Sequence, residues 1–309
     1  MVARVVFMGT PDFAVNILDV LVHSDVNVVG VISQPDRPVG RKHELKATPI
    51  KGFALKHNLT VYQPEKVSML YETLAALDLD LIVTCAYGQF IPDKILQLPK
   101  KGCVNVHASL LPKYRGGAPI HTVLLNGESE TGVTLMRTIK KMDAGDMIAS
   151  VIVPISEDDT VGSLHDKLRV AGADLLAQWL PAILDGSAPQ IPQDETQVSF
   201  APNITPQQEF ISMQRDIRVV YNHVRGLTPW PIGYGIINGK KLKLIAASMR
   251  SDDPQAAPGT VLGYDEGLLI ACLYGILVVT QCQWEGKGKM SAEEFYRGIG
   301  KTLVKEVFE

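Results

Sequence analysis

The apolar positions in the first half of the chain alternate between two patterns. Continuous apolar runs predict buried parallel strands, and helix-like periodic runs predict helices between them. The expected strands cover residues 4–9, 26–32, a short stretch near 61, 79–84, a strand carrying Asn105 and His107, 133–138 and 147–153. The expected helices cover 13–22, 48–57, 66–76, 117–125 and 161–184. This alternation predicts an α/β fold with a Rossmann-like, doubly wound and mostly parallel sheet.

The pattern changes after residue 185. The stretch 185–197 is polar and contains two prolines, which is typical of a linker. A helix expected around 212–225 is followed by short strands at 233–237, 242–247, 259–263, 268–272 and 276–283. Short strands separated by turns predict a small antiparallel barrel of the OB-like kind, a shape that often holds nucleic acid. We therefore expect a first domain over residues 1–188, a linker over 189–208 and a second domain over 209–309.

Composition narrows the class of protein. The chain has 309 residues, 46% of them hydrophobic, which is enough for two domains with buried cores. The formal net charge of −3 gives no overall sign of a polyanionic partner, so a nucleic-acid partner needs local basic patches. Four cysteines without a C-x-x-C pair indicate buried thiols in a reducing compartment. With no signal-peptide pattern and no apolar stretch of roughly 20 residues, we expect a cytoplasmic, monomeric protein without membrane contact.

Candidate chemistry lies in the stretch 102–119. Asn105 and His107 alternate with valines, so on a strand the amide and the imidazole share one side. The amide can donate to a developing oxyanion, and the imidazole can carry a proton near neutral pH. The competing interpretation, which an isolated Asn-x-His would favour, is structural: Asn105 caps the turn and His107 makes a hydrogen bond to a nearby loop. A second motif, Met142-Asp-Ala-Gly-Asp146, lies in a turn between two apolar runs. It could bring the carboxylate of Asp143 to the imidazole.

Two cofactor fingerprints are missing. The turn after the first strand reads Gly9-Thr-Pro-Asp12 and lacks G-x-G-x-x-G, and no Walker-type phosphate loop is present. Cys103 lies four residues before His107, but no second pair of metal ligands follows. We therefore expect no NAD, no ATP and no metal.

The motif Asn-x-His-x-Ser-Leu-Leu-Pro-x-Tyr-Arg-Gly, which begins at Asn105 and is followed by Met-Asp-x-Gly from Met142, resembles the folate-dependent formyltransferases. The resemblance implies that 10-formyltetrahydrofolate is the co-substrate and that Asn105, His107 and Asp143 are catalytic. It also implies folate contacts from two loops, at Tyr87, Gly88, Phe90, Ile91, Ser109, Leu110, Leu111 and Pro112. An ordinary buried turn remains the alternative for the first of these loops.

A basic loop joins the second expected strand to the next helix. Between Arg37 and Lys56 it carries six basic residues against one acid, and it is longer than the roughly 2–6 residues usual for such a connection. It is either a flexible contact for a phosphate backbone or a solvated loop with routine charges. Its Gln-Pro-Asp-Arg-Pro-x-Gly-Arg resembles the insertion loop with which tRNA-formylating members of the family engage the acceptor stem, and this singles out Arg41. The expected tRNA contacts are Arg37, Arg41, Lys42, Lys46, Lys240, Lys241, Lys243, Lys287 and Lys289.

The second half carries further resemblance to the tRNA-formylating members, at Thr228-Pro-Trp-Pro, at Pro258-Gly-Thr-Val and around Gln283. The linker departs from the usual Tyr-Ala-x-Lys-Ile, because Asn203 stands in place of the lysine, and Ser212-Met213 replaces the usual Asp-Trp. The resemblance implies methionyl initiator tRNA as the acceptor. Another acceptor (glycinamide ribonucleotide, an amino sugar nucleotide or water) and a binding protein without turnover are the competing hypotheses. Four cations lie beside the motifs: Lys113, Arg115, Lys140 and Lys141. They either bind an anionic group, which is the substrate's phosphate or the folate's glutamate tail, or they are simple surface charges.

Overall fold

The computed structural model describes residues 2–39 and 44–309. The chain divides into two compact units. Unit 1 comprises Met1–Pro119, Glu130–Pro154 and His165–Ala201, and unit 2 comprises Ile120–Ser129, Ile155–Leu164 and Pro202–Glu309. The last boundary, after Ala201, falls inside the stretch expected to be a linker, so the first part of that stretch is built into unit 1.

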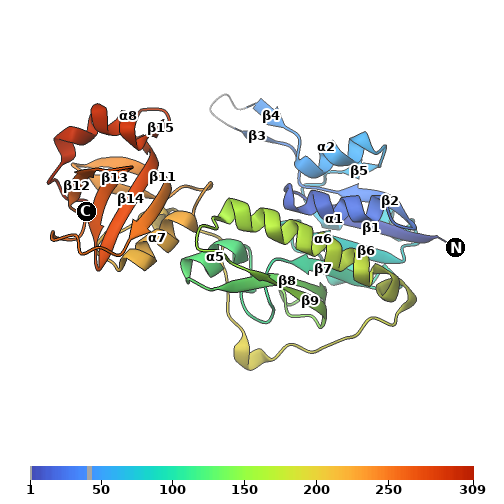
Figure 1. Ribbon diagram of the computed structural model, residues 1–309. Coiled ribbons are helices and arrows are strands. Elements are labelled where there is room, and N and C mark those ends of the chain that lie inside the picture. Colours follow the sequence, from blue (N-terminus) through green and yellow to red (C-terminus); the bar gives the residue numbers. More distant parts are fainter. Residues whose placement is uncertain (1, 40–43) are drawn as a thin grey trace. The chain divides into compact units, whose positions relative to one another are not determined.

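Unit 1 is organised around a seven-stranded sheet with the order β5-β2-β1-β6-β7-β8-β9 (Figure 1). The strands are β1 (Ala3–Gly9), β2 (Val26–Ile32), β5 (Val61–Tyr62), β6 (Leu81–Cys85), β7 (Cys103–His107), β8 (Glu130–Arg137) and β9 (Met147–Pro154). The pairs from β5 to β7 are parallel, and β8 and β9 add to the β7 edge in antiparallel pairing. The prediction of a mostly parallel sheet is confirmed.

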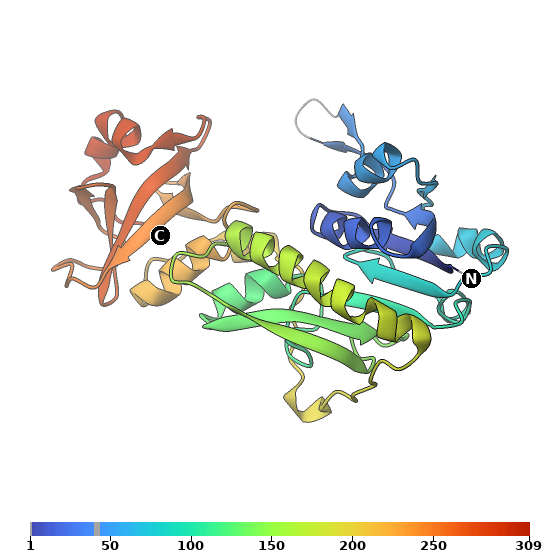
Figure 2. The ribbon, with the colours of Figure 1, turned by 45° about the vertical axis from the view of Figure 1, so that its right-hand side comes forward.

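Helices cover both faces of this sheet. On one face lie α1 (Phe13–Val22) and α6 (Val161–Asp185), and Figure 2 shows α6 running along the strands. At Gly172 of α6, an added Cβ would lie 3.1 Å from Val106 of β7 and 3.5 Å from Ile17 of α1, so helix, strand and helix are in close contact. On the other face, η1 (Val67–Leu70), α3 (Tyr71–Ala75) and α4 (Asp93–Leu96) enclose a core with Met8 and Ile82. Cover on both faces confirms the doubly wound prediction.

The loops that follow β1, β2 and β6 meet at the carboxyl ends of these strands. Thr10 Oγ1 donates to the carbonyl of Tyr87 at 2.9 Å, and Gln34 Nε2 donates to the same carbonyl at 3.2 Å. Strand order reverses here, because the chain runs from β1 outward to β2 and β5 and then returns to the other side of β1 with β6. Sites in open α/β sheets form at such a switch point.

The basic stretch after β2 forms a hairpin on either side of residues 40–43. Its strands are β3 (Arg37–Val39) and β4 (Glu44–Lys46), which pair antiparallel, and it leads into α2 (Pro49–Lys56). The Thr48 side chain caps α2 by accepting from the Lys51 amide at 3.2 Å. The expectation of a loop without secondary structure was wrong for these flanking residues, because they form two short paired strands.

Unit 2 contains a six-stranded antiparallel sheet. Its path runs β10 (Tyr234–Ile237), β11 (Lys240–Arg250), β14 (Gly275–Trp284), β13 (Leu268–Cys272) and β12 (Val261–Tyr264), and β15 (Met290–Ser291) pairs with β14. The sheet curls around a core shared with α7 (Ile217–Arg225) and α8 (Ala292–Arg297), to which Val220 and Phe295 contribute (Figure 1). This curled half-barrel agrees with the expected OB-like domain. The remaining helix, α5 (Pro119–Leu125), begins at the end of the first segment of unit 1.

The short elements differ most from the expectation. The helix expected at 66–76 is a 3₁₀ turn followed by the five residues of α3, and the helix expected from 212 begins only after the Asp216 cap. Residues 213–215, just before that cap, form a bend, and the Ile211 amide ahead of them donates to the Tyr234 carbonyl at 2.8 Å. Sequence periodicity did not predict α4, α8, β15 or the 3₁₀ turns Glu195–Gln197, Pro206–Glu209 and Gly300–Leu303, which are too short to show one. Across the described chain, no helix combines the length and apolar character needed to cross a membrane.

Ser291→Ala tests a local contribution to unit 2. Ser291 caps α8 by accepting from the Glu294 amide at 3.1 Å, and Glu294 accepts in return from the Ser291 amide at 3.0 Å. Loss of this cap should lower the free energy of unfolding by about 1 kcal/mol, measured by urea denaturation. Ser251→Ala, at an exposed serine outside any helix or strand, is the matched control. An equal effect of both changes would show that the cap contributes nothing specific.

Candidate active site

Asn105 and His107 lie on β7, the strand where parallel and antiparallel pairing meet. Asn105 is paired with Thr84 of β6 on one side and with Met136 of β8 on the other, and His107 is paired with Thr134. Backbone pairing therefore fixes where each side chain leaves the strand. The two residues are separated by one position and so lie on the same face.

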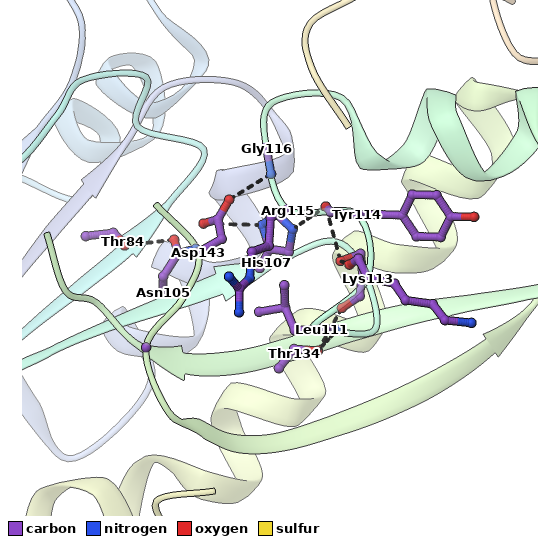
Figure 3. Close-up of polar contacts among 12 residues, drawn as sticks. Thr84, Asn105, His107, Leu111, Lys113, Tyr114, Arg115, Gly116, Thr134 and Asp143 are labelled. Carbon is purple, nitrogen blue, oxygen red and sulfur yellow. Dashed lines mark hydrogen bonds and ion pairs between the residues drawn. The ribbon is translucent and has the colours of Figure 1, made fainter. Parts of the chain in front are cut away.

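The amide of Asn105 has a defined orientation (Figure 3). Thr84 Oγ1 donates to Asn105 Oδ1 at 2.8 Å, and Thr84 is only 4% exposed. With Thr84 as the donor, the amide oxygen faces the hydroxyl, and Nδ2 is left to donate elsewhere. The amide is thus arranged as a donor towards the site.

The imidazole of His107 is nearly buried, with 6% of the residue exposed. Its Nε2 lies 3.0 Å from the carbonyl oxygen of Tyr114. A carbonyl can only accept, so Nε2 carries a hydrogen and donates. Nδ1 is the nitrogen that faces Asp143, with 3.8 Å between Nδ1 and Asp143 Oδ1. The predicted approach of carboxylate and imidazole is therefore present in the structure, as Figure 3 shows.

Asp143 lies in the turn between β8 and β9, with a backbone φ of +48°. Its Oδ2 accepts a hydrogen bond from the amide of Gly116 at 2.9 Å, which leaves Oδ1 towards the imidazole. Gly116 itself has a φ of +128°, and a Cβ there would lie 2.5 Å from the carbonyl oxygen of Ala201. Glycine is therefore required at this position both by its conformation and by the close approach of the 199–201 segment.

A second set of contacts holds the turn around Asp143. Gln193 Nε2 donates to the carbonyls of Asp143 and Gly145, at 2.9 and 2.8 Å. Gln193 Oε1 in turn accepts from Nε and Nη2 of Arg115, at 3.1 and 2.7 Å. Arg115 is 1% exposed, and its Nη2 also lies 2.9 Å from Glu195 Oε1.

These contacts involve two of the four cations near the motifs, Arg115 and Lys141. Arg115 is not a surface charge: Gln193 and Glu195 occupy its Nε and Nη2, and its buried Nη1 has no hydrogen-bond partner in the described chain. Lys141 pairs with the same glutamate, Nζ to Oε2, at 2.7 Å. The two oxygens of Glu195 thus join the loop after β7 to the turn after β8.

The residues expected to contact folate follow β6 and β7, which are neighbouring strands. Tyr87 and Ile91 are buried, Gly88 has a φ of +83°, and Phe90 is 64% exposed. Burial raises the pKa of the Tyr87 hydroxyl to about 12, so that hydroxyl stays neutral at physiological pH. Two hydrogen bonds hold the second loop. Ser109 Oγ donates to the Lys113 carbonyl within the loop, and the Leu111 amide donates to Thr134 Oγ1 of β8. Leu110 and Pro112 of this loop are half-buried.

The expected tRNA contacts fall into two groups, one in each unit. In unit 1, Arg37 and Lys46 are register partners on the β3–β4 hairpin, whereas Arg41 and Lys42 lie outside the described residues. In unit 2, pairing of β11 with β14 brings the two basic clusters of the sequence to one end of the sheet. The Glu285 amide donates to the Lys241 carbonyl at 3.0 Å, directly before the turn that carries Lys287. The members of this group are Lys240, Lys241, Lys243, Lys287 and Lys289.

Aromatic rings accompany this unit 2 cluster. Lys241 Nζ lies 4.0 Å from the centroid of the Tyr234 ring, and Lys240 Nζ lies 5.9 Å from that of Trp284. Both distances are within the range of cation–π contacts. Cations beside aromatic rings are typical of surfaces that bind nucleic acid.

Sequence reasoning missed two residues that shape the site, Thr84 and Gln193, and it gave no role to Gly116, the last residue of the motif that begins at Asn105. Thr84 ends an apolar run, and its role depends on the parallel register with Asn105, which the sequence does not give. Gln193 lies in a polar stretch without periodicity, so it carried no signal. Within residues 2–39 and 44–309, no group of three or more His, Cys, Asp or Glu side chains is arranged to hold a metal ion.

Comparison with known proteins adds independent findings. The family model described as formyl transferase matches residues 3–180, and that of the formyl transferase carboxyl-terminal domain matches residues 203–300. The methionyl-tRNA formyltransferase of Halalkalibacterium halodurans is 48% identical over 304 residues, which cover 97% of this chain and 96% of the relative. The enzyme of the same name from Bacillus licheniformis is 50% identical over 301 residues, covering 96% and 95%.

Among solved structures, the fold is similar to that of an N-formyltransferase from Helicobacter canadensis, determined with folinic acid and dTDP-3-aminofucose. The TM-score is 0.70 at 21% identity, and the match covers 92% of this chain and 100% of that one. At this identity the likeness concerns the fold alone. The family models and the two relatives, in contrast, match the sequence itself along nearly its whole length. The chain belongs to the formyl transferase family.

Proposed function

We propose that this protein transfers the formyl group of 10-formyltetrahydrofolate to the free amino group of methionyl initiator tRNA, for translation initiation. The observation that carries the proposal is the match at 48% and 50% identity, over nearly the full length, to two methionyl-tRNA formyltransferases. The site described above supplies the chemical groups that such a transfer needs. We place the reaction in the cytoplasm, carried out by a single chain, since Asn105, His107 and Asp143 all belong to one unit.

The reaction is an acyl transfer to nitrogen. The amine adds to the formyl carbon, the carbonyl oxygen gains negative charge, and the bond from carbon to the folate N10 then breaks. One proton leaves the amine and one is gained by N10, so the overall proton balance is zero. The amino group of an aminoacyl ester has a pKa at or below the usual α-amino value of about 7.7–8.0, so a substantial fraction is neutral near physiological pH and the amine needs no strong base. The protein must instead stabilise the oxyanion and move a proton.

Asn105 donates to the oxyanion. Its Nδ2 is free for this because Thr84 occupies Oδ1. The donor is already oriented before substrate binds, so it needs no reorganisation when charge develops. One such donor lowers the barrier by roughly 3 kcal/mol.

His107 and Asp143 handle the proton. Nδ1 of His107 is the nitrogen available for exchange, since Nε2 donates to the Tyr114 carbonyl. At 3.8 Å, Asp143 is too far for a direct hydrogen bond to Nδ1 but is within ion-pair distance of a protonated imidazole. The pair is thus arranged to take the proton from the amine and return it at N10, with the carboxylate balancing charge on the imidazole.

The folate is expected to bind at the loops after β6 and β7. The apolar side chains of Tyr87, Ile91 and Leu111 suit a flat aromatic ring system, and the exposed ring of Phe90 is available to cover it. The tRNA is expected to contact the β3–β4 hairpin in unit 1 and the cluster around Lys241 in unit 2. Both surfaces carry exposed cations, as contacts to a phosphate backbone require.

The direct test is formyl transfer by the purified protein from formyltetrahydrofolate to charged initiator tRNA. Uncharged tRNA, an amino sugar nucleotide, glycinamide ribonucleotide and water alone are the comparison acceptors. Formylation of the methionyl ester at a rate far above all of these is expected. Faster transfer to any small amine, or release of formate alone, would overturn the proposed acceptor.

Asp143→Asn tests the proton step. Asparagine keeps the size of the side chain but removes the negative charge that balances a proton on His107, so kcat should fall by roughly 10²–10⁴-fold. The Kd for charged tRNA should stay near normal, because the change leaves both basic surfaces intact. Single-turnover kinetics and filter binding measure the two quantities. A parallel loss of tRNA binding and thermal stability would instead indicate a folding defect.

Thr84→Val tests the orientation of Asn105. Valine keeps the volume but removes the hydroxyl that holds Oδ1, so the amide can rotate, and we expect kcat to fall about tenfold with little change in either KM. Thr84→Ser, which keeps the hydroxyl, should retain most of the activity. Thr131→Val is the matched control, since Thr131 is also a buried strand residue but its Oγ1 has no hydrogen-bond partner among the described residues. Equal kinetics for Thr84→Val and wild type would exclude this role.

Lys241→Ala tests the basic cluster of unit 2. Removing one phosphate contact should weaken tRNA binding and lower the slope of log K against log salt by about 1. The control is Arg250→Ala at the other end of β11, where Asp265 and Glu266 already pair the charge. Binding is measured by fluorescence anisotropy from low to moderate salt. An unchanged slope in Lys241→Ala would remove this cluster from the tRNA surface.

A further inference from the structure

The segment from Gln193 to Ala201 lies along the loop that follows β7. The Tyr114 amide donates to Ser199 Oγ at 2.9 Å, and the Arg115 amide donates to the Ser199 carbonyl at 2.9 Å. The Ala201 amide returns a hydrogen bond to the Arg115 carbonyl at 2.7 Å. This segment, which we call the strap, therefore adds one backbone pairing to the loop that contacts both His107 and Asp143.

At its start, the strap also contacts the turn that carries Asp143. Gln193 Nε2 donates to two carbonyls of that turn, at Asp143 and Gly145. Both hydrogens of one amide nitrogen are thus used on the two carbonyls that flank Ala144. The contact bridges the turn at the point where Asp143 has its left-handed backbone conformation, which costs a non-glycine residue about 1 kcal/mol or more.

Arg115 determines which way the Gln193 amide faces. Its Nε and Nη2 both point at Oε1, so the amide oxygen must lie on the arginine side and the nitrogen on the turn side. The reverse orientation would set two N–H donors against the guanidinium and the oxygen against two carbonyls. Arg115 is itself buried and fixed by Glu195, so the amide has one acceptable arrangement.

We propose that Gln193, oriented by Arg115, is a positioning residue that holds the Asp143 carboxylate at the distance from His107 that proton transfer requires. The proposal rests on the proposed function, because it assigns Asp143 the proton step of formyl transfer. Gln193 touches no reacting atom and acts through the backbone of Asp143. Of the strap residues, Gln193 alone is assigned this role, although it lies in a stretch whose composition is that of a linker.

Two substitutions separate positioning from simple support of the fold. Gln193→Ala removes the whole contact. Gln193→Glu keeps the size and keeps an oxygen for Arg115, but it replaces the donor nitrogen by an oxygen that faces the two carbonyls. If the two hydrogen bonds from Gln193 Nε2 to the turn position Asp143, both changes lower kcat by roughly 10–100-fold, with each KM within about threefold of wild type. If only the Arg115 pairing matters, Gln193→Glu retains activity, and the proposal is wrong.

Gln197→Ala is the matched control. Gln197 is the same residue type, four positions further along the strap, and its Nε2 donates to Asp194 Oδ2 at 2.9 Å and not to the turn. It should keep wild-type kcat, and thermal unfolding of all variants should occur within a few degrees of wild type. A kcat loss in Gln197→Ala equal to that in Gln193→Ala would assign the effect to the strap as a whole and overturn the proposal.

A double-mutant cycle shows whether Gln193 acts through Asp143. In the Asp143→Asn background, Gln193→Ala should lower kcat by less than about threefold, because the group that it positions has already been removed. Losses that multiply in full would mean that Gln193 acts independently, which contradicts the inference. Wild-type protein that fails to formylate charged tRNA would overturn the proposed function itself. Wild-type turnover with unaffected Gln193 variants would overturn only the positioning role.

Discussion

The carbonyl of Tyr114 and the amide of Gly116 fix the imidazole and the carboxylate of the site at the same time. One accepts from His107 Nε2 and the other donates to Asp143 Oδ2, so two peptide groups in one short loop determine how Nδ1 and Oδ1 face each other. Hydrogen bonds to a charged group contribute roughly 1.5–3 kcal/mol, which is enough to hold a side chain in one orientation. The rest of unit 1 can be understood as the support for this loop.

That loop has an unfavourable backbone. Tyr114 has a φ of +60° and Gly116 a φ of +128°, and a left-handed non-glycine residue costs about 1–3 kcal/mol. Hydrogen bonds with the strap offset this cost: the Tyr114 and Arg115 amides donate to Ser199, and the Arg115 carbonyl accepts from the Ala201 amide. A strained loop backed by a paired strap is stiffer than either segment alone. Stiffness here has a function, since proton transfer is sensitive to small changes in distance.

The sequence predicted those parts of the structure that depend on local periodicity. Asn105 and His107 could be placed on one face because a strand repeats every two residues, and α1 and β2 have the bounds that their apolar runs predicted. The approach of Asp143 was foreseen only as an option and through a family resemblance, since nothing local connects a turn to a strand that precedes it by more than 30 residues. Thr84 and Gln193 could not be found, because each acts through a long-range register that only the folded chain defines.

Arg115 shows why a charge must be located before a role is given to it. From the sequence it was one of four equivalent cations, but a guanidinium with 1% exposure must be paired or it would destabilise the fold. Its Nε and Nη2 are committed to Gln193 and Glu195, so the guanidinium is held in place, and its Nη1 is left without a partner in the described chain. The lysines around β11 are at least partly exposed instead. Their two groups, Lys240 to Lys243 and Lys287 to Lys289, are far apart in sequence and are brought together by antiparallel pairing of β11 with β14. With a net charge of −3, attraction of a polyanion depends on such local gathering, because at physiological salt a charge is felt over only about 8 Å.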